Sequence, residues 1–505
     1  MDQYSLYHEA DQRIRIERFK GMEPPMQSRP DPTGFPVGLP SEETLRTVVF
    51  DGELIRRLDR PGPRYTSYPT TNHFSEEFNE QSYQNCVAQE EAAPQPRDLS
   101  LYFHIPFCRH LCFYCACNKI VTRNRDKAAK YLDYLLRELE LRSVGFKDGR
   151  RVSQLHWGGG TPTYLEPAQM ANLMQSIRKR FFLSDDALGE YSIEVDPRTV
   201  SQETVGFLRS LGFNRISIGV QDFDPQVQKK VHRIQSEEET QRVVETARQS
   251  KFRSINLDLI YGLPAQSVES FERTLDQVLA IYPDRVALYN YAHLPHLFRP
   301  QKKIDARDLP PPEVKLEILR CAVERLTRAG YHYIGMDHFA RADDELAIAQ
   351  REHRLQRNFQ GYSTHPECHL IGFGISAIGM MGASYSQNFR TLDSYYQSID
   401  QNRLPIFRGI ILTPDDRLRR TLIHSLACQF RISIPAIEES YGIRFDAYFQ
   451  DELRELAELE ALGLLSTGPQ EIRVTLKGRL LVRNICMIFD RYLRAERMPQ
   501  YSRVI

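Results

Sequence analysis

The sequence predicts an α/β fold, with a mainly parallel sheet followed by a mainly helical C-terminal part. Three observations lead to this prediction. Six short runs of β-branched and aromatic residues lie between positions 100 and 295, helical patterns separate them, and the composition becomes helical after Leu412. The chain has 505 residues, which is more than one compact core needs and suggests about three structural units.

The six strand-like runs are each bounded by polar or turn-forming residues. They lie at 100–106, 153–159, 190–197, 214–223, 254–263 and 285–292. Strand–helix units in succession form a parallel sheet with right-handed crossovers. Six units are fewer than the eight of a closed barrel, so an open three-quarter barrel and a doubly wound sheet both fit the pattern.

The segments between the strands have the period of amphipathic helices. Two apolar faces are formed by Leu132, Leu135, Leu136 and Leu139, and by Met170, Leu173, Met174 and Ile177. Ser201 is placed to cap a helix that carries Val205 and Leu208. A further helix is predicted from 314 to 329.

Composition divides the chain into four segments. Residues 1–48 are a proline-rich N-terminal extension with little apolar periodicity, which predicts an extended or mobile segment. Residues 49–99 are an N-terminal segment expected to pack on the barrel or sheet, and their run PRYTSYPT (63–70) favours a loop packed on a domain surface because its prolines exclude a helix interior. Residues 100–395 form the sheet domain, and 396–505 the helical domain.

The C-terminal segment predicts three helices, a hairpin at Gly468-Pro469 and a last helix near 477–494. This order resembles a winged-helix unit. The third helix, DELRELAELEALGLL, is acidic, whereas binding to nucleic acid needs a basic surface. We therefore interpret this part as structural or as a cover over the substrate.

Charge and hydropathy exclude several classes of protein. Lys plus Arg and Asp plus Glu both number 66, which gives no electrostatic basis for binding nucleic acid or an anionic membrane surface. The longest uncharged stretch, 370–389, has the length of a membrane span, but its four glycines among serines indicate a glycine-rich motif. The N-terminus has no signal pattern, so we expect a cytoplasmic protein without a membrane span.

The strongest motif is HIPFCRHLCFYCACNK, which contains four of the nine cysteines. Cys108, Cys112 and Cys115 form C-x3-C-x2-C on a loop directly after the first predicted strand. Three thiolates on one short loop can converge on a soft metal or an iron–sulfur cluster. A structural zinc site would usually need another ligand pair. The remaining cysteines outside the motif are predicted to be small core residues: Cys86, Cys321, Cys368, Cys428 and Cys486.

Cys117 follows Cys115 by two residues, and a pair of ligands at that spacing would strain the loop. We interpret Cys117 as a nearby thiol rather than a fourth ligand. With three protein ligands, a four-iron cluster keeps one iron open for a small chelating ligand. A disulfide between these two cysteines does not fit a cytosolic protein.

Polar residues are found at the ends of the predicted strands. The second strand ends in Gly158-Gly159-Gly160-Thr161, where a ligand can approach the backbone closely. Glu194 ends the third strand, where a carboxylate is costly unless it is paired, and a bound amino group is a suitable partner. Gln221 ends the fourth strand, Asp258 lies in the fifth and Ala292 ends the sixth. Parallel barrels build their sites at this rim, so together these residues predict one site, although each alone could equally make a structural hydrogen bond.

The cysteine loop followed by WGGGTPT resembles the radical S-adenosylmethionine (SAM) superfamily, and more closely its oxygen-independent coproporphyrinogen III oxidase (HemN) family. The shared segments, in chain order, are PRYTSYPT, HIPFCRHLCFYCACNKIVTR, LHWGGGTPTYL, SIEVDPR, ISIGVQDF, LDLIYGLP, YNYAHLP, GMDHFA, RNFQGY, RNICMIFDRYLR and SRVI. They extend over residues 50 to 505. The resemblance implies a partial (β/α)6 radical SAM barrel with a mainly helical, winged-helix-like C-terminal domain.

The resemblance also implies the cofactors and their ligands. Cys108, Cys112 and Cys115 would ligate a [4Fe-4S] cluster whose open iron chelates SAM. The contacts to that molecule would come from Tyr102, Gly159 and Glu194, with Ile378 nearby. A second SAM molecule is implied, with contacts from Tyr114, Gly160, Thr161, Gln221, Arg233, Asp258 and Ala292. The family pattern has phenylalanine at the position of Tyr114, so we expect a role for its backbone.

The implied reaction is an oxidative decarboxylation. A 5′-deoxyadenosyl radical would remove a hydrogen from a propionate β-carbon, and loss of carbon dioxide and one electron would leave a vinyl group. Two propionates of coproporphyrinogen III would react in turn to give protoporphyrinogen IX, in porphyrin and haem biosynthesis. Cys117 and Gln360 are the expected catalytic residues, and Arg64 is a candidate for binding a propionate. An electron donor and an electron acceptor are required, and we expect a monomer.

Three alternative functions fit parts of the sequence. A HemW-like haem chaperone shares the cysteine loop, but it is shorter and is not expected to contain PRYTSYPT or the pair Cys117-Asn118. A radical SAM haem-degrading methyltransferase fits two SAM sites. A non-enzymatic carrier of haem or of a cluster is the third.

Overall fold

Six strands of the largest β-sheet coincide with the six predicted runs. The computed structural model describes residues 47–365 and 368–495, so nearly all of the predicted extension 1–48 and the terminal SRVI lie outside the described residues. The six strands are β1 (Leu99–Ile105), β4 (Arg151–Gly159), β6 (Glu190–Val195), β7 (Arg215–Gln221), β8 (Ser254–Tyr261) and β9 (Arg285–Asn290). They pair in parallel in that order. The prediction of successive parallel strand–helix units is confirmed.

The six parallel strands do not close into a barrel. Further strands extend the sheet at both of its edges, and the two outermost strands do not pair with each other. Next to β1 lie, in order, β14 (His369–Phe373), β15 (Ile378–Met381), β16 (Ser384–Asn388) and β17 (Ile406–Ile411). Next to β9 lie β11 (His338–Arg341) and then β10 (Tyr331–Gly335). The path therefore ends in two different strands, as an open partial barrel requires. Strand β17 lies beyond the boundary predicted at 395, so the sheet extends further along the chain.

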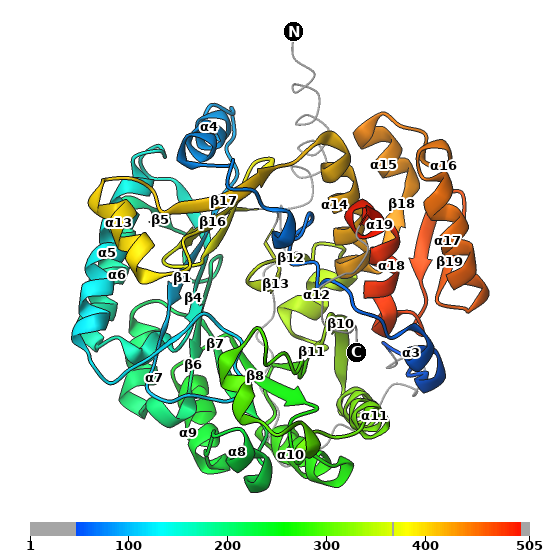
Figure 1. The fold of residues 1–505 in the computed structure, drawn as a ribbon, viewed down its shortest axis with the longest axis horizontal. Coiled ribbons are helices and arrows are strands. Elements are labelled where there is room, and N and C mark those ends of the chain that lie inside the picture. The colour runs from blue at the N-terminus through cyan, green and yellow to red at the C-terminus, as the bar shows by residue number, and fades with distance from the viewer. Residues whose placement is uncertain (1–46, 366–367, 496–505) are drawn as a thin grey trace, which may run out of the picture. The chain divides into compact units, whose positions relative to one another are not determined.

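The predicted helices cover the outer side of the curved sheet (Figure 1). They are α5 (Asp126–Ser143), α6 (Pro167–Arg180), α7 (Gln202–Ser210), α9 (Glu237–Gln249) and α10 (Val268–Ile281), with the short α8 (Pro225–Lys230) before α9 and α11 (Pro312–Arg328) after α10. The predicted apolar faces are buried, except that Leu136 is half-buried. The Ser201 hydroxyl accepts from the Thr204 N–H as the predicted cap of α7.

The uncharged stretch 370–389 forms strands β14, β15 and β16. All but one of the residues in these three strands are buried, which explains the absence of charge. Its glycines fit close strand packing: a Cβ on Gly372 would lie 2.6 Å from the Ile378 carbonyl oxygen. Among the described residues, no helix combines the length and the apolar character that a membrane crossing needs.

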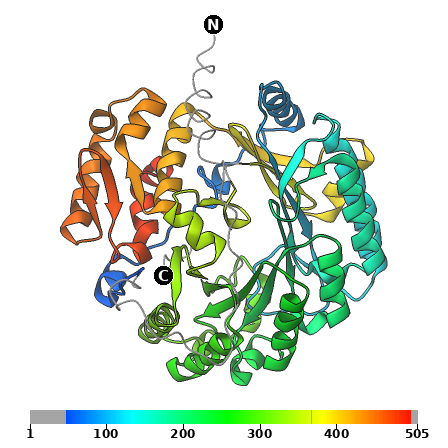
Figure 2. The same cartoon turned by 180° about the vertical axis from the view of Figure 1, so that it is seen from behind.

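The C-terminal region contains the predicted helices and hairpin (Figure 2). The helices are α14 (Pro414–Gln429), α15 (Ile434–Tyr441), α16 (Phe445–Tyr448) and α17 (Gln450–Ala461), and the strands are β18 (Arg431–Ser433), β19 (Leu465–Thr467) and β20 (Glu471–Val474). The predicted last helix is in fact two, α18 (Val482–Ile488) and α19 (Arg491–Ala495). It breaks because the Asp490 carboxylate accepts from the N–H groups of Tyr492 and Leu493 and so begins a new helix.

The N-terminal segment contains α3 (Gly52–Leu58) and α4 (Glu80–Glu91), with the run PRYTSYPT between them. This run forms a loop, as predicted, and its aromatic side chains pack inward: Tyr65 and Tyr68 are only 7% and 2% exposed. The Tyr65 hydroxyl donates to Asp490 (2.9 Å), and the Tyr68 hydroxyl accepts from the Arg491 N–H (3.2 Å). The loop is buried because its aromatic side chains pack against the break between α18 and α19, a contact that local sequence does not show.

Candidate active site

The cysteine loop projects from the carboxyl end of β1 and is anchored at both of its ends. The short strands β2 (Phe107–Cys108) and β3 (Ile120–Val121) pair in parallel and close the loop. On its other side, the N–H groups of Gly160 and Thr161 donate to the carbonyls of Ile105 and Phe107. The glycine-rich segment after β4 therefore positions the start of the cysteine loop.

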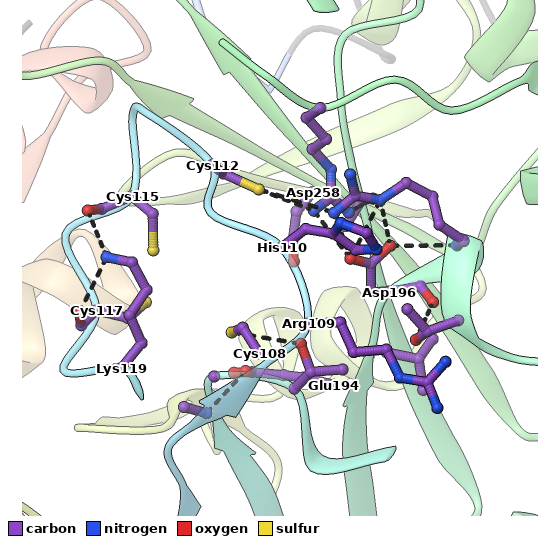
Figure 3. A pocket seen from close by; sticks show the side chains of 18 of the residues that line it. Cys108, Arg109, His110, Cys112, Cys115, Cys117, Lys119, Glu194, Asp196 and Asp258 are labelled. Carbon is purple, nitrogen blue, oxygen red and sulfur yellow. Dashed lines mark hydrogen bonds and ion pairs between the residues drawn. The ribbon is translucent and has the colours of Figure 1, made fainter. Parts of the chain in front are cut away.

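One cavity brings together most of the predicted site residues (Figure 3). Its lining includes Cys108, Cys112, Tyr114, Cys115, Cys117, Gly159, Gly160, Thr161, Glu194, Gln221, Arg233 and Asp258. The predicted residues outside this lining are Tyr102, Ala292, Gln360 and Ile378. Residues that are up to 150 positions apart in the sequence thus meet at the carboxyl ends of the parallel strands, as the rim argument predicted.

Cys112 lies beside two arginines. Its Sγ is 3.6 Å from Arg233 Nη1 and 3.8 Å from Arg198 Nη2. Both guanidinium groups also pair with Asp196, at 3.4 and 2.6 Å. Two guanidinium groups are therefore placed to donate to this sulfur and to any anionic ligand that it holds.

Cys108 and Cys115 have different surroundings. Burial raises the pKa of Cys108 to about 11, and the Thr161 hydroxyl, which donates to its Sγ (3.6 Å), opposes that shift. Hydrogen bonding from Cys117 and the nearby Lys119 ammonium lower the pKa of Cys115 to about 6. The Lys119 ammonium also donates to the Cys115 carbonyl (3.0 Å), which holds the loop in a closed turn.

Cys117 is exposed at the edge of the same cavity. Its hydrogen bond to the Cys115 sulfur raises the pKa of the Cys117 thiol well above its usual value. All nine cysteines are free thiols, and of the five outside the loop only Cys86 is not fully buried. The donor set of Cys108, Cys112 and Cys115 fits an iron–sulfur cluster. Within the described chain, no three His, Cys, Asp or Glu side chains are placed to hold a single metal ion.

The glycine-rich segment requires two of its glycines. Gly159 has a φ of 112°, a left-handed conformation that other residues rarely adopt. A Cβ on Gly160 would lie 2.6 Å from the Pro106 carbonyl oxygen and 2.8 Å from the Phe107 carbonyl oxygen. Glycine is therefore needed for the cysteine loop to lie directly against this segment.

Glu194 is held as a carboxylate at the cavity wall. Desolvation acts to raise its pKa, but hydrogen bonds from His156 Nε2 (3.2 Å) and the Gly159 N–H (3.1 Å) outweigh it, so the pKa lies below the ordinary value. Tyr102 stacks on His156 with ring centroids 5.8 Å apart, and its hydroxyl bonds to His104 Nδ1 (3.0 Å). His156 therefore connects Tyr102 to Glu194, because it stacks on the first and hydrogen-bonds to the second. Ile378 belongs to the same apolar cluster as Tyr102.

Gln221, Arg233 and Asp258 form the opposite wall. Gln221 has a φ of 69° where β7 ends, an uncommon conformation that is concentrated at functional sites. Burial and the charge of Glu194 raise the pKa of Asp258 to about 7, although Ser217 and Asn256 donate hydrogen bonds to it. This wall offers amide, cationic and carboxyl groups to a polar ligand.

Gln301 bridges the backbones of Tyr114 and Ala292. The Gln301 amide donates to the carbonyls of both Tyr114 (3.0 Å) and Ala292 (3.2 Å). The prediction that Ala292 ends the sixth strand was wrong by two residues, because β9 ends at Asn290.

A second cavity adjoins the first and shares four lining residues with it: Glu194, Ser217, Asp258 and Tyr289. Gln360 lines this second cavity from the turn between β12 (Gln356–Asn358) and β13 (Gly361–Ser363). Its Oε1 accepts from the Ser100 hydroxyl (3.4 Å), and its buried Nε2 has no partner among the described residues. An unpaired buried amide facing a cavity is available to a bound molecule.

Several site residues were missed or misjudged from the sequence. Asp196, Arg198 and His156 touch the cavity or its wall, and of these Asp196 and Arg198 lie within SIEVDPR, which gave the available signal. Arg64 lines neither cavity. It pairs with Asp337 (3.0 Å) and lies over the Tyr289 ring, so a carboxylate of the chain already occupies it.

The comparisons with known proteins agree with this geometry. The radical SAM superfamily model matches residues 102–278, and the HemN C-terminal domain model matches 412–481. The chain is 50% identical to the oxygen-independent coproporphyrinogen III oxidase of Pseudomonas aeruginosa over 91% of its length and the whole of that protein. The Escherichia coli relative of the same name is 51% identical over 92% of this chain and all of its own.

A solved structure agrees as well. Coproporphyrinogen III oxidase (HemN) from Escherichia coli, described as a radical SAM enzyme, superposes with a TM-score of 0.84 at 50% identity, covering 88% of this chain and 100% of that one. Its fold confirms the open barrel and the helical C-terminal region. The chain therefore belongs to the radical SAM superfamily and, within it, to the oxygen-independent coproporphyrinogen III oxidase family.

Proposed function

We propose that this protein converts two propionates of coproporphyrinogen III to vinyl groups and so forms protoporphyrinogen IX without oxygen. The observation that carries the proposal is the cavity whose lining brings three loop cysteines together with a glycine-rich segment and the Glu194 carboxylate. The identity of about half of all residues with enzymes of that name supports it. Radical SAM membership implies a [4Fe-4S] cluster and SAM.

The residues that would hold the cluster are Cys108, Cys112 and Cys115. Arg198 and Arg233 would balance the negative charge of the sulfur ligands on the Cys112 side. Cluster and SAM together supply, when bound, a 5′-deoxyadenosyl radical able to remove a hydrogen from a propionate. The protein's part is to orient both molecules and to exclude water and oxygen.

The chain offers matched groups for SAM. Glu194, kept anionic by His156 and Gly159, would accept from its amino group, and Tyr102 and Ile378 would form the apolar side of the site. Gly159 lets the ligand approach the backbone. A second molecule would contact the backbone of Tyr114 and Ala292, together with Gly160, Thr161, Gln221, Arg233 and Asp258.

The substrate would enter the second cavity, which is lined by Gln360 with its unpaired amide nitrogen Nε2. Cys117, at the edge of the first cavity, is the other candidate catalytic residue. The proposal includes a monomer, a cytoplasmic location suited to nine free thiols, and separate electron donor and acceptor.

The test is an anaerobic assay with the reconstituted cluster. Coproporphyrinogen III, dithionite and SAM are supplied, and protoporphyrin is measured after oxidation of the products. The expected result is a tricarboxylic intermediate followed by protoporphyrin. A Cys112→Ser protein, which lacks a cluster ligand, is the control.

The alternatives give different results in the same assay. Protein that cleaves SAM but never decarboxylates this substrate contradicts the proposal. Haem that binds tightly and passes to an acceptor protein would instead indicate a carrier, and transfer of a methyl group to haem would indicate a methyltransferase.

A further inference from the structure

The outer face of the cysteine loop has an unusual charge pattern. The segments 99–125, 225–235 and 295–303 contain ten Lys and Arg residues and no Asp or Glu, although the whole chain has 66 of each sign. If charges were mixed as in the rest of the chain, several acids would occur in such a length. The pattern distinguishes these three segments, which are bordered by Asp98, Asp126, Asp224 and Asp305, from the rest of the chain.

The three segments pack together. The Phe113 N–H donates to the Val231 carbonyl (2.9 Å), and His232 Nδ1 bonds to the Leu111 carbonyl (2.8 Å). The rings of Phe113 and His232 stack at 5.0 Å, and the Lys303 ammonium lies 5.5 Å from the Phe113 ring centre. The cysteine loop, the end of α8 and the 3-10 helix Arg299–Lys303 thus form one continuous surface.

We call this the loop-side basic surface, defined by the exposed side chains Arg123, Lys229, Lys230, Lys302 and Lys303 together with Arg109, which also lines the first cavity. Lys230 pairs with Asp308 (2.7 Å). The other five make no ion pair with any residue in 47–365 or 368–495, so their charge is available to a partner.

Two apolar side chains lie within the same segments. Ile234 is 64% exposed and Leu297 is 59% exposed. Exposed apolar groups among charged ones are the usual composition of a protein interface with a polar rim. Isolated surface apolar residues are common, but here they coincide with the basic segments around the cysteine loop.

We propose that the loop-side basic surface docks an acidic, low-potential, one-electron carrier protein that reduces the cluster. The inference rests on the cluster proposed at Cys108, Cys112 and Cys115. The carrier would lose one electron and the cluster would gain it, with no proton or other group transferred. Electron transfer slows steeply with distance, so the donor must approach the loop itself, and complementary charge steers such short-lived encounters.

Direct binding tests this proposal without relying on turnover. The ligand is a purified plant-type [2Fe-2S] ferredoxin, a small acidic one-electron carrier, and basic cytochrome c is the comparison ligand. Affinity for the cluster-loaded protein is measured anaerobically at low and high ionic strength. We expect ferredoxin to bind, cytochrome c not to bind, and the ferredoxin affinity to fall with salt.

Two double variants with equal change of charge make the test specific. Lys229→Glu with Lys302→Glu reverses two charges of the loop-side basic surface. Lys147→Glu with Lys179→Glu reverses two exposed charges that precede β4 and β6, at the opposite edge of the parallel strands. The first should weaken ferredoxin binding about tenfold, and the second should change it by less than about twofold.

A chemical reductant separates this proposal from the proposed function. With dithionite the Lys229→Glu/Lys302→Glu protein should keep wild-type activity, whereas with reduced ferredoxin it should turn over more slowly at limiting donor. Failure of every protein to make protoporphyrin with dithionite would reject the proposed function and leave the binding result unaffected. The docking surface would be overturned if both double variants lost the same ferredoxin affinity, or if neither lost any. It would also be overturned if a short DNA duplex bound more tightly than ferredoxin and displaced it.

Discussion

At the scale of single residues, the loop cysteines differ more in their surroundings than in their spacing. Cys112 is buried between Arg198 and Arg233, whereas Cys117 is exposed, its thiol bonded to Cys115 and its carbonyl to the Lys119 ammonium. Two guanidinium groups thus contact the Cys112 sulfur, whereas the Cys117 thiol contacts another thiol. The three-ligand assignment stays a prediction from the spacing, because burial raises the pKa of Cys108 as well, to about 11.

Replacing Cys112 with alanine should abolish the absorbance of the cluster, because a ligand between two guanidinium groups is lost. Replacing Cys117 with alanine should retain most of that absorbance. Both proteins are reconstituted with iron and sulfide, and visible absorbance and iron content are measured. Loss of the cluster in the Cys117 variant would show that four cysteines act as ligands.

Asp258 should make folding stability depend on pH. Its pKa is raised from 3.8 to about 7 in the folded protein, so between about pH 4 and pH 7 the unfolded chain releases a proton that the folded protein retains. Stability is then lost as pH rises through this window and levels off above it. Asp258→Asn removes the effect, so its Tm relative to wild type should increase from pH 5 to pH 8.

The measurement uses protein without added SAM, unfolded by heat at both pH values. Asp133→Asn, at an exposed position of α5, is the control. A difference in Tm between Asp258→Asn and wild type that is the same at pH 5 and pH 8 would contradict the raised pKa.

At the scale of elements, the glycine-rich segment after β4 positions the cysteine loop. The Gly160 N–H donates to Ile105, and no side chain fits between Gly160 and the carbonyl of Pro106. The loop geometry thus depends on β4 as much as on the loop's own residues. A defect in this segment should therefore affect the cluster before it affects the fold.

Gly160→Ala should lower the iron content after reconstitution by more than half, because its Cβ would push the start of the loop away. Gly206→Ala is the matched control, since a Cβ at Gly206 in α7 meets nothing within 4 Å. That variant should keep the cluster and gain up to about 1 kcal/mol of stability from helix propensity. Equal iron contents in the two variants would mean that the loop tolerates the displacement.

The buried tyrosine loop joins the N-terminal segment to the end of the chain. Tyr65→Phe removes the donor to the Asp490 Oδ2 atom and should destabilise the protein by about 1–3 kcal/mol, as measured by urea unfolding. Tyr448→Phe removes a hydrogen bond to Asp415 at a 43% exposed position and should cost less than about 0.5 kcal/mol. Equal losses of unfolding free energy in the two variants would contradict a stabilising role of the buried hydrogen bond between Tyr65 and Asp490.

Local sequence predicted those elements whose periodicity is set by burial, and it missed those that depend on distant contacts. The six parallel strands and the cap at Ser201 follow from patterns within a few residues. Strands β14 to β16 did not, because small residues and glycines that allow close strand packing give no alternating pattern. Arg198 and His156 were missed for a different reason, because their partners Cys112 and Glu194 are far away in sequence.

At the scale of the whole molecule, a net charge of zero conceals a separation of charge. When the ten basic residues of the three loop-side segments are set aside, 56 basic residues stand against 66 acidic ones in the rest of the chain. The three segments around the proposed cluster therefore carry a local excess of basic residues. Zero net charge gave no basis for predicting binding to polyanions, and it could not reveal this local excess.

The scaffold should not need the cluster to fold. The sheet and its helices bury a large continuous core that includes the fully buried β1 residues Leu101, Phe103 and Ile105, whereas small metal domains fold only with metal because they lack such a core. Iron removal by an anaerobic chelator should abolish visible absorbance and leave the far-UV circular dichroism and a cooperative thermal transition. Loss of the helical signal together with the iron would contradict this.

The anchoring of the cysteine loop by β2, β3 and the glycine-rich segment has a consequence for the lifetime of the protein. When oxygen destroys the cluster, the backbone hydrogen bonds that anchor the cysteine loop remain, since none of them involves the cluster. We therefore expect that the cluster can be rebuilt in the existing protein as long as the three cysteines stay reduced. A cell returning to anaerobic conditions would have to supply iron and sulfide, but no new polypeptide, to restore the pathway.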